Sequence, residues 1–176
     1  QSLQKVDRPQ ESVLDSNKRV ANAAAFIENN PEKQQEWSNK FLEELKNKRI
    51  QPAGRIMAGA NIDDQGNYIS NLTLYNCYVV PSPTDSRGGI IDTLKTMIEI
   101  MSRGGGAGIS LSTLRPRYAY VKGVHGKSSG AVSWGGIYSY ATGLIEQGGS
   151  RRGALMLMLD DWHPDILAFI GSKKTK

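Results

Sequence analysis

The stretch LTLYNCYVVPSP, residues 72–83, opens a regular alternation of predicted strands and helices. Its threonine, tyrosines and valines favour extended backbone, and the run stops at Pro81 and Pro83, which strands rarely accommodate. Downstream we expect a helix over 87–103, a strand over 107–112, a helix over 133–147, a strand over 154–159 and a short helix over 166–170. Connections of this length favour parallel strands, so the sequence predicts an α/β fold.

Two helices are predicted before this stretch, over residues 11–28 and 31–48. Apolar residues recur at helical spacing in both, and Asn29-Asn30-Pro31 separates them. Residues 51–71 are rich in Pro, Gly, Asn and Asp and are predicted to be irregular. We therefore expect a helical N-terminal region, 1–50, followed by an α/β part, 51–176.

The composition excludes several protein classes. The 176 residues are 39% hydrophobic and 22% charged, which supports a folded core and argues against disorder. No apolar run approaches the roughly 18 residues that span a bilayer, and the N-terminus lacks the apolar core of a signal peptide. A single cysteine, Cys77, rules out an internal disulfide and indicates a reducing cytoplasm.

Positive charge and glycine concentrate in the second half of the chain. The net charge is +5, and residues 101–150 carry five basic groups but one acid, Glu146. Thirteen of the 19 glycines lie between Gly104 and Gly153. Exposed backbone N–H groups together with Arg and Lys attract anions, so one interpretation is a phosphate-bearing ligand. The other is a turn-rich segment with solvated charges.

Two nucleotide-binding motifs do not fit the sequence. Gly126-Lys127-Ser128 ends a P-loop pattern, but the required first glycine falls on Val121. Gly104-Gly105-Gly106 starts a dinucleotide fingerprint whose third glycine position holds Ile109. Neither pattern therefore supports a nucleotide site.

Other chemistries have little support from the residues. No base or orienting acid stands near Cys77, and the acids around residues 160–165 are expected to cap helices rather than bind a metal. His163 is expected to make a structural hydrogen bond. A nucleic-acid-binding module is the non-enzyme alternative, because Tyr118 and Tyr120 stand among cations that could accompany stacked bases. No recognition-helix or RNP-like signature accompanies them.

A series of short segments in fixed order is more specific than any single motif. It comprises PAGRIMAGA (52–60), LYNCYVVP (74–81), DS (85–86), GGGAGI (104–109), LRPR (114–117), SSGAVS (128–133), QGGSRRGA (147–154), and HPDI (163–166) with FI (169–170). This series resembles the large catalytic subunit of ribonucleotide reductase over about residues 50–172. PAGR and NCYV are most similar to the adenosylcobalamin-dependent class II branch, and class I remains open.

The resemblance implies a ribonucleotide reductase-like fold and a radical reaction. The family fold is a ten-stranded α/β barrel with an N-terminal helical region, of which this chain would hold the helical region and the first part of the barrel. The family reduces the ribose 2′-OH of a ribonucleotide by thiyl-radical chemistry, with two cysteines that a thioredoxin-type reductant regenerates. Cys77 matches the first of this pair, at the end of a barrel strand.

The resemblance also implies substrate contacts. Asn76 lies where the family has a small polar residue at the ribose, and Gly106 matches a glycine against which the substrate packs. Ala60 lies near the substrate phosphate position. Many relatives have Thr or Ser there, so here the backbone N–H alone could serve.

The family's specificity effector, a dNTP or ATP, binds at a dimer interface. Asp85, Ser86 and Arg87 match the helix-start segment of that site, while Arg115, Lys122 and Gly123 match its flexible loop. Asp85 can accept from a base or sugar, and the cations can neutralise phosphates. The helix over 87–103 would then serve a homodimer contact.

The chain departs from the family by lacking the second redox cysteine, the radical cysteine and the Asn-x-Cys-x-Glu segment. We expect these beyond Lys176, in a complementary C-terminal reductase part, and adenosylcobalamin bound mainly outside this chain. Alone it should not reduce nucleotides. A split gene product, a fragment and a non-catalytic nucleotide-binding remnant are the three explanations. We expect no membrane association and no direct nucleic-acid binding, and di- and triphosphate substrates both remain open.

Overall fold

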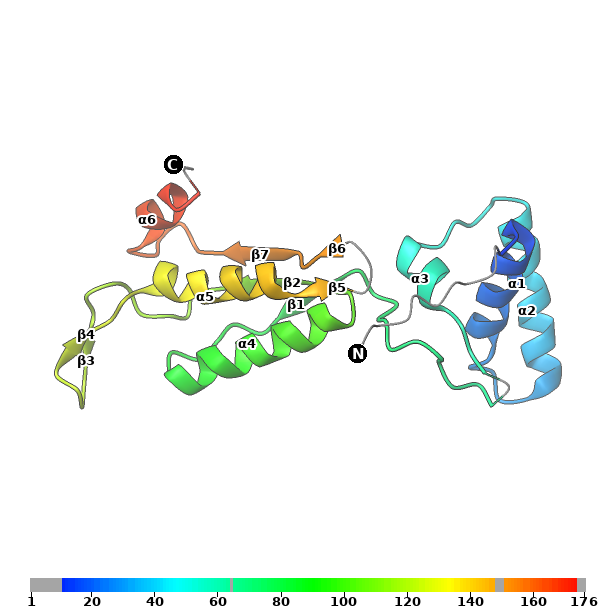
Figure 1. Ribbon diagram of the computed structural model, residues 1–176, viewed down its shortest axis with the longest axis horizontal. Coiled ribbons are helices and arrows are strands. Elements are labelled where there is room, and N and C mark those ends of the chain that lie inside the picture. Colours follow the sequence, from blue (N-terminus) through cyan, green and yellow to red (C-terminus); the bar gives the residue numbers. More distant parts are fainter. Residues whose placement is uncertain (1–10, 64, 148–150, 174–176) are drawn as a thin grey trace. The chain divides into compact units, whose positions relative to one another are not determined.

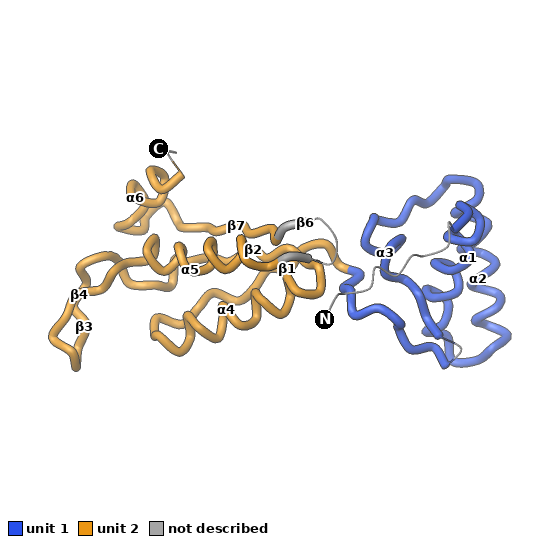
Figure 2. Tube along the Cα trace, viewed as in Figure 1, with its two compact units in different colours: residues 1–74 blue, residues 75–176 orange. Residues whose placement is uncertain are grey.

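The structure is a computed structural model that describes residues 11–63, 65–147 and 151–173. By its internal contacts the chain separates into two compact units, Gln1–Leu74 and Tyr75–Lys176, coloured blue and orange in Figure 2. The division falls later than residue 50, where the sequence predicts the boundary, because Ala60 and Leu74 pack with Val20 of the first helix. None of the helices in the described part of the chain has the length and apolar composition needed to cross a bilayer.

The first unit contains the two expected helices and a third, unexpected one. Ser12 and Asn30 cap the first two helices by accepting hydrogen bonds from Asp15 N (3.1 Å) and Lys33 N (2.7 Å), and Pro31 occupies the first turn of the second. A short helix lies within the segment predicted to be irregular. The three are α1 (Val13–Ala25), α2 (Pro31–Lys46) and α3 (Gly54–Gly59).

The second unit is built on a three-stranded parallel sheet, which confirms the predicted α/β class. The strands, in spatial order, are β1 (Cys77–Val80), β2 (Gly106–Ser110) and β7 (Leu155–Met158). The helices are α4 (Arg87–Ser102), α5 (Ala131–Leu144) and α6 (Ile166–Gly171). Two small antiparallel pairs complete the unit, β3 (Tyr120–Val121) with β4 (Gly126–Lys127) and β5 (Glu146–Gln147) with β6 (Arg151–Arg152). Figure 1 labels these elements along the chain.

Several boundaries differ from the sequence-based prediction. The first strand begins at Cys77 rather than at residue 72, and α5 begins at Ala131 and ends at Leu144. The β3–β4 hairpin is formed by two-residue strands, too short to give a periodic signal. The sheet is open in the described residues, so the closed barrel that the resemblance implies is not seen in them.

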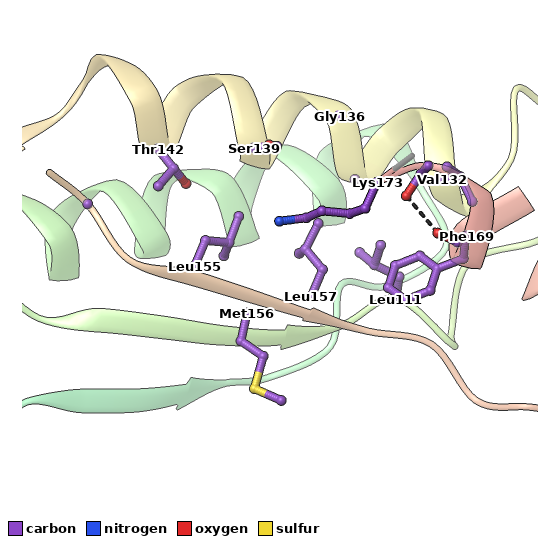
Figure 3. A pocket seen from close by; sticks show the side chains of 13 residues that line it. Leu111, Val132, Gly136, Ser139, Thr142, Leu155, Met156, Leu157, Phe169 and Lys173 are labelled. Carbon is purple, nitrogen blue, oxygen red and sulfur yellow. Dashed lines mark hydrogen bonds between the residues drawn. The ribbon is translucent and has the colours of Figure 1, made fainter. Parts of the chain in front are cut away.

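The core lies between one face of the sheet and the two long helices. Figure 3 shows α4 and α5 on the same side of the strands, with Leu155 and Leu157 pointing toward them. From the helices, Met97, Met101 and Tyr138 are fully buried in this core. The apolar side chains of alternate strand positions therefore fix which face of the sheet the helices cover. The strand members are Val80, Ala107, Ile109, Leu155 and Leu157.

Tyr138 provides a test of this core. Its hydroxyl donates a hydrogen bond of 3.0 Å to the Ile90 carbonyl of α4, and desolvation raises the pKa of the phenol above its ordinary value. We expect Tyr138→Phe to lower the free energy of unfolding by about 1 kcal/mol, the usual worth of a buried hydrogen bond. Urea denaturation followed by circular dichroism measures it. Tyr140→Phe is the matched control, because Tyr140 is 71% exposed, and an equal loss in both variants would contradict the argument.

Candidate functional site

The single cysteine lies on the sheet face opposite the helices. Cys77 is the first residue of β1, its thiol is free, and it is exposed. The register pairs it with Gly106, the first residue of the central strand. Because paired residues of neighbouring strands point to the same face, the position beside the thiol carries no side chain. The thiol is therefore accessible next to bare backbone.

A strip of backbone without side chains continues along the central strand. Gly108 follows Gly106 on the same face, and on either side of it lie Val79, 85% exposed, and Met156, 63% exposed. Figure 3 shows Met156 pointing away from the helices, opposite to its neighbours on β7. Gly106 is buried, and a Cβ there would lie 3.4 Å from the Ala154 carbonyl oxygen, an ordinary van der Waals contact.

Asn76 and Ala60, the other predicted substrate contacts, are held through their backbones. The Asn76 carbonyl accepts a 2.8 Å hydrogen bond from Gly106 N, while the residue itself is exposed. Ala60, in the first unit, is buried; its N–H donates to the Ile56 carbonyl (2.9 Å) and its carbonyl accepts from Arg19 Nη1 (2.6 Å). A phosphate at Ala60 would have to compete with the Ile56 carbonyl for the Ala60 N–H. The substrate site is therefore better supported by the residues around Cys77.

A pocket of about 410 Å³ forms where β1 and β2 end. Asp85 follows β1 and Arg115 follows β2, and the carboxyl ends of neighbouring parallel strands lie at the same edge of a sheet. Five of the six predicted effector residues line this pocket, and the sixth, Gly123, stands between two lining residues with a positive φ of 99°. The lining residues are Asp85, Ser86, Arg87, Ile90, Leu114, Arg115, Val121, Lys122, Val124, Lys127, Ser128, Ser129 and Trp134.

Positive charge predominates among the groups that line the pocket. Its cations are Arg87, Arg115, Lys122 and Lys127, and its one acid is Asp85. Arg115 binds that acid three times, through Nε to Oδ2 (2.7 Å), its backbone N to Oδ1 (3.2 Å) and Nη2 to the Asp85 carbonyl (3.2 Å). The acid is thus neutralised and the net charge of the lining favours an anion.

The start of α4 adds a polar wall to this pocket. Ser86 caps the 16-residue helix by accepting a 3.0 Å hydrogen bond from Gly89 N. The helix N-terminus contributes partial positive charge beside the cations. Sequence reasoning missed eight of the thirteen lining residues, four of which can offer a charge, a hydroxyl or a ring: Lys127, Ser128, Ser129 and Trp134. The first two belong to the failed P-loop match, and their approach to Asp85 depends on the β3–β4 hairpin.

A second, larger pocket of about 790 Å³ lies between α5, β7 and α6. Figure 3 shows Leu155, Leu157 and Phe169 reaching into it, with Thr142 and Ser139 on the helix above. No residue predicted for catalysis or effector binding lines this pocket. We therefore treat the pocket at the ends of β1 and β2 as the candidate ligand site.

Hydrogen bonds occupy the rings of the two histidines to different extents. His125 Nδ1 shares a 2.9 Å hydrogen bond with the Tyr120 hydroxyl, and both ring nitrogens of His163 are engaged with backbone groups. Among the residues that the structure describes, no group of three or more His, Cys, Asp or Glu side chains could hold a metal ion.

Comparison with known protein families gives one match over the second unit. The family model "Ribonucleotide reductase, barrel domain" matches residues 75–176. The chain is 34% identical, over 168 residues, to the vitamin B12-dependent ribonucleoside-diphosphate reductase of Mycobacterium tuberculosis H37Rv, covering 94% of this chain and 23% of the relative. It is 45% identical over 100 residues to the enzyme of the same name from Thermoplasma acidophilum (57% of this chain, 13% of the relative). A Variola virus ribonucleoside-diphosphate reductase large subunit is 37% identical over 106 residues (60% and 14%). The chain thus spans less than a quarter of the length of these relatives.

Proposed function

The chain belongs to the ribonucleotide reductase family, whose barrel-domain model covers residues 75–176, and we propose that it supplies one redox cysteine and the effector site of such an enzyme. The pocket at the ends of β1 and β2 carries this proposal. Residues expected from the resemblance to bind a nucleotide effector, 30 positions apart in sequence, line one cationic pocket there.

The proposed redox role rests on Cys77. Reducing a ribonucleotide to a deoxyribonucleotide removes the 2′-hydroxyl as water and consumes two electrons and two protons, which two thiols provide on forming a disulfide. An exposed thiol beside a glycine strip suits this step, because a ribose can approach the sulfur without meeting a side chain on β2. The second thiol and the radical cysteine would come from the complementary C-terminal reductase part, and a thioredoxin-type protein would reduce the disulfide.

The substrate wall would consist of the same sheet face. Gly106 would let the ribonucleotide pack against backbone, and the exposed Asn76 could hydrogen-bond the ribose. Ala60 stays the weakest of the three proposed contacts, because its N–H is already bonded.

The histidines are the described residues to test as ligands for a cobalamin. The relatives from M. tuberculosis and T. acidophilum carry "vitamin B12-dependent" in their names. A cobalt ligand such as imidazole needs a free ring nitrogen. Both nitrogens of His163 are hydrogen-bonded, whereas His125, which is exposed, uses only Nδ1. We propose that any cobalamin is held mainly outside this chain, because His125 stands in an exposed turn between β3 and β4 and belongs to no group of three or more candidate ligands in the described residues.

The effector would be a nucleoside triphosphate. Arg87, Lys122 and Lys127 can face its phosphates, while Trp134 offers an aromatic ring within the same pocket. Helix α4, which begins at this pocket and has Ile91 and Ile98 exposed, would serve the contact between two copies of the chain. The second candidate function is a nucleotide-binding remnant without catalysis, which the same pocket supports.

Direct binding tests this proposal on the chain itself. At about 0.15 M salt, where charges more than ~8 Å apart are largely screened, we expect a fluorescent deoxynucleoside triphosphate to bind at least about tenfold more tightly than single-stranded DNA. The reason is that the cations line one pocket, which suits a compact triphosphate better than the extended backbone of a DNA strand. Fluorescence anisotropy gives both dissociation constants.

Two lysine variants control for general charge effects. Lys122→Ala should weaken triphosphate binding, whereas Lys95→Ala, an exposed lysine of α4 outside the pocket, should not. Equal losses in both variants, or tighter binding of DNA, would reject the effector pocket.

A further inference from the structure

The segment that follows β7 reaches the same edge of the sheet as the candidate effector pocket. His163 and Asp165, 2% and 9% exposed, are buried polar residues to which the proposed redox and effector chemistry gives no role. Their hydrogen bonds extend to a chain segment that is 34 to 49 positions earlier in sequence. That segment, residues 114–131, contains the β3–β4 hairpin and supplies most of the residues that line the pocket.

Asp165 ties together the beginning and the end of this segment. Both carboxylate oxygens lie 3.1 Å from Arg117 N, and Oδ2 also lies 3.1 Å from Ala131 N. Ala131 is the first residue of α5, whose own N-cap residue, Gly130, has no side chain to accept a hydrogen bond. The carboxylate thus supplies the acceptor and the negative charge that the start of this 14-residue helix favours.

His163 holds the entry to the segment. The backbone N–H of Asp165 can only donate, so Nδ1 of His163, 3.1 Å away, accepts. The ring is then neutral with its proton on Nε2, which donates a 2.8 Å hydrogen bond to the Leu114 carbonyl. Leu114 immediately precedes Arg115, the residue that binds Asp85 across the pocket. His163 therefore fixes the backbone from which Arg115 extends.

The close approach at the other end requires glycine. Gly130 has φ +89°, and a Cβ there would lie 2.7 Å from Asp165 Oδ2 and 2.8 Å from Arg117 N. Both distances are shorter than a Cβ contact allows. An alanine at this position would separate the carboxylate from the N–H that it binds.

From these contacts we propose that His163 and Asp165 are positioning residues that clamp both ends of segment 114–131 and thereby hold the pocket in its binding geometry. Arg115 immediately follows one clamped point, Leu114, and Ser128 and Ser129 lie just before the other, Ala131. The clamp thus fixes the separation between these two groups of lining residues. The identity of the ligand, a nucleoside triphosphate, rests on the proposed function; the clamp does not.

Amide hydrogen exchange and triphosphate binding, measured on the same variants, test the clamp. Asp165→Asn keeps the size of the side chain but removes its charge and one acceptor, and Gly130→Ala pushes the carboxylate away while leaving it charged. We expect at least about tenfold faster exchange in segment 114–131 and at least about tenfold weaker triphosphate binding in both variants, as for loss of a charged hydrogen bond. Matched controls are Asp161→Asn, an exposed acid in the same turn, and Gly143→Ala, which meets open space.

A double-variant measurement separates positioning from general stability. If Asp165 acts through the geometry around Arg115, Asp165→Asn should add less than about twofold to the binding loss of Arg115→Ala. The labelling rate of Cys77, at the opposite end of its strand from the pocket, should stay unchanged in every variant. If Asp165→Asn does not fold, Gly130→Ala decides.

The outcomes distinguish the two proposals. If the wild-type chain binds no triphosphate but exchange is still faster in both variants, the effector site is rejected and the clamp is retained. Unchanged exchange in both variants would overturn the clamp. Faster exchange in the variants with unchanged triphosphate affinity would also overturn the clamp, because the binding geometry of the pocket would then not depend on these hydrogen bonds.

Discussion

Replacing Cys77 by serine, in a reductase completed with its other catalytic parts, should lower multi-turnover reduction by at least about a thousandfold, the range expected when a group that takes part in proton transfer is lost. Serine keeps the size of the side chain but cannot form the disulfide that receives the two electrons. Because Cys77 is exposed at the start of β1, we expect Cys77→Ser to fold normally, so a loss of activity would not come from misfolding. Deoxyribonucleotide formation with excess thiol reductant measures the loss.

Two further measurements keep this result specific. Triphosphate binding should be unchanged by Cys77→Ser, because Cys77 and the pocket lie at opposite ends of β1. Radical formation should persist, because the proposed function assigns the radical cysteine to the complementary reductase part. Sustained turnover of Cys77→Ser with the same reductant would remove Cys77 from the redox pair and favour the nucleotide-binding remnant.

Periodicity and turn chemistry predict much of the second unit. The predicted strands over 107–112 and 154–159 and the predicted helix over 87–103 agree with β2, β7 and α4 within two residues at every end. Their signals are local: a β-prone run for the strands, and for the helix an apolar stripe and a serine, Ser86, which caps α4 in the structure. A helix between successive strands favours a parallel sheet. The apolar face of each strand then sets the register of that sheet.

Long-range contacts are what sequence reasoning misses. Nothing near Ala131 signals that its N–H is capped by Asp165, 34 residues later, because Gly130 has no side chain to suggest a cap. Likewise the β3–β4 hairpin and the short α3 carry no periodic pattern of useful length. Both depend on tertiary contacts, which override weak local preferences.

The proposed effector residues illustrate how topology brings separate motifs together at one pocket. Asp85 and Arg115 belong to different sequence segments, each weak alone. They meet because β1 and β2 are adjacent and parallel, so that the segments leaving their carboxyl ends share one edge. His163 reaches the same edge because β7 is the next parallel strand.

Arg115→Ala should therefore weaken triphosphate binding by about 10- to 100-fold, the range for losing hydrogen bonds to a charged group. The change acts twice. It removes a cation from the pocket, and it leaves the Asp85 carboxylate, previously bound by Nε at 2.7 Å, as an unpaired negative charge facing the phosphates. In a completed reductase, the response to effector should fall more than the basal rate, since Arg115 lines the pocket and not the Cys77 face of the sheet.

The repulsive part of this loss can be isolated with a second substitution. Asp85→Asn in the Arg115→Ala background removes the exposed negative charge, so it should restore part of the affinity, while Arg103→Ala, an exposed arginine just after α4 and outside the pocket, should leave binding unchanged. Titrations at low and at physiological salt should show a larger Arg115→Ala effect at low salt, because screening weakens both the lost attraction and the new repulsion. An effector response that Arg115→Ala leaves intact would mean that the cations of this pocket bind no triphosphate, and the charge excess of residues 101–150 would then be a solvated surface.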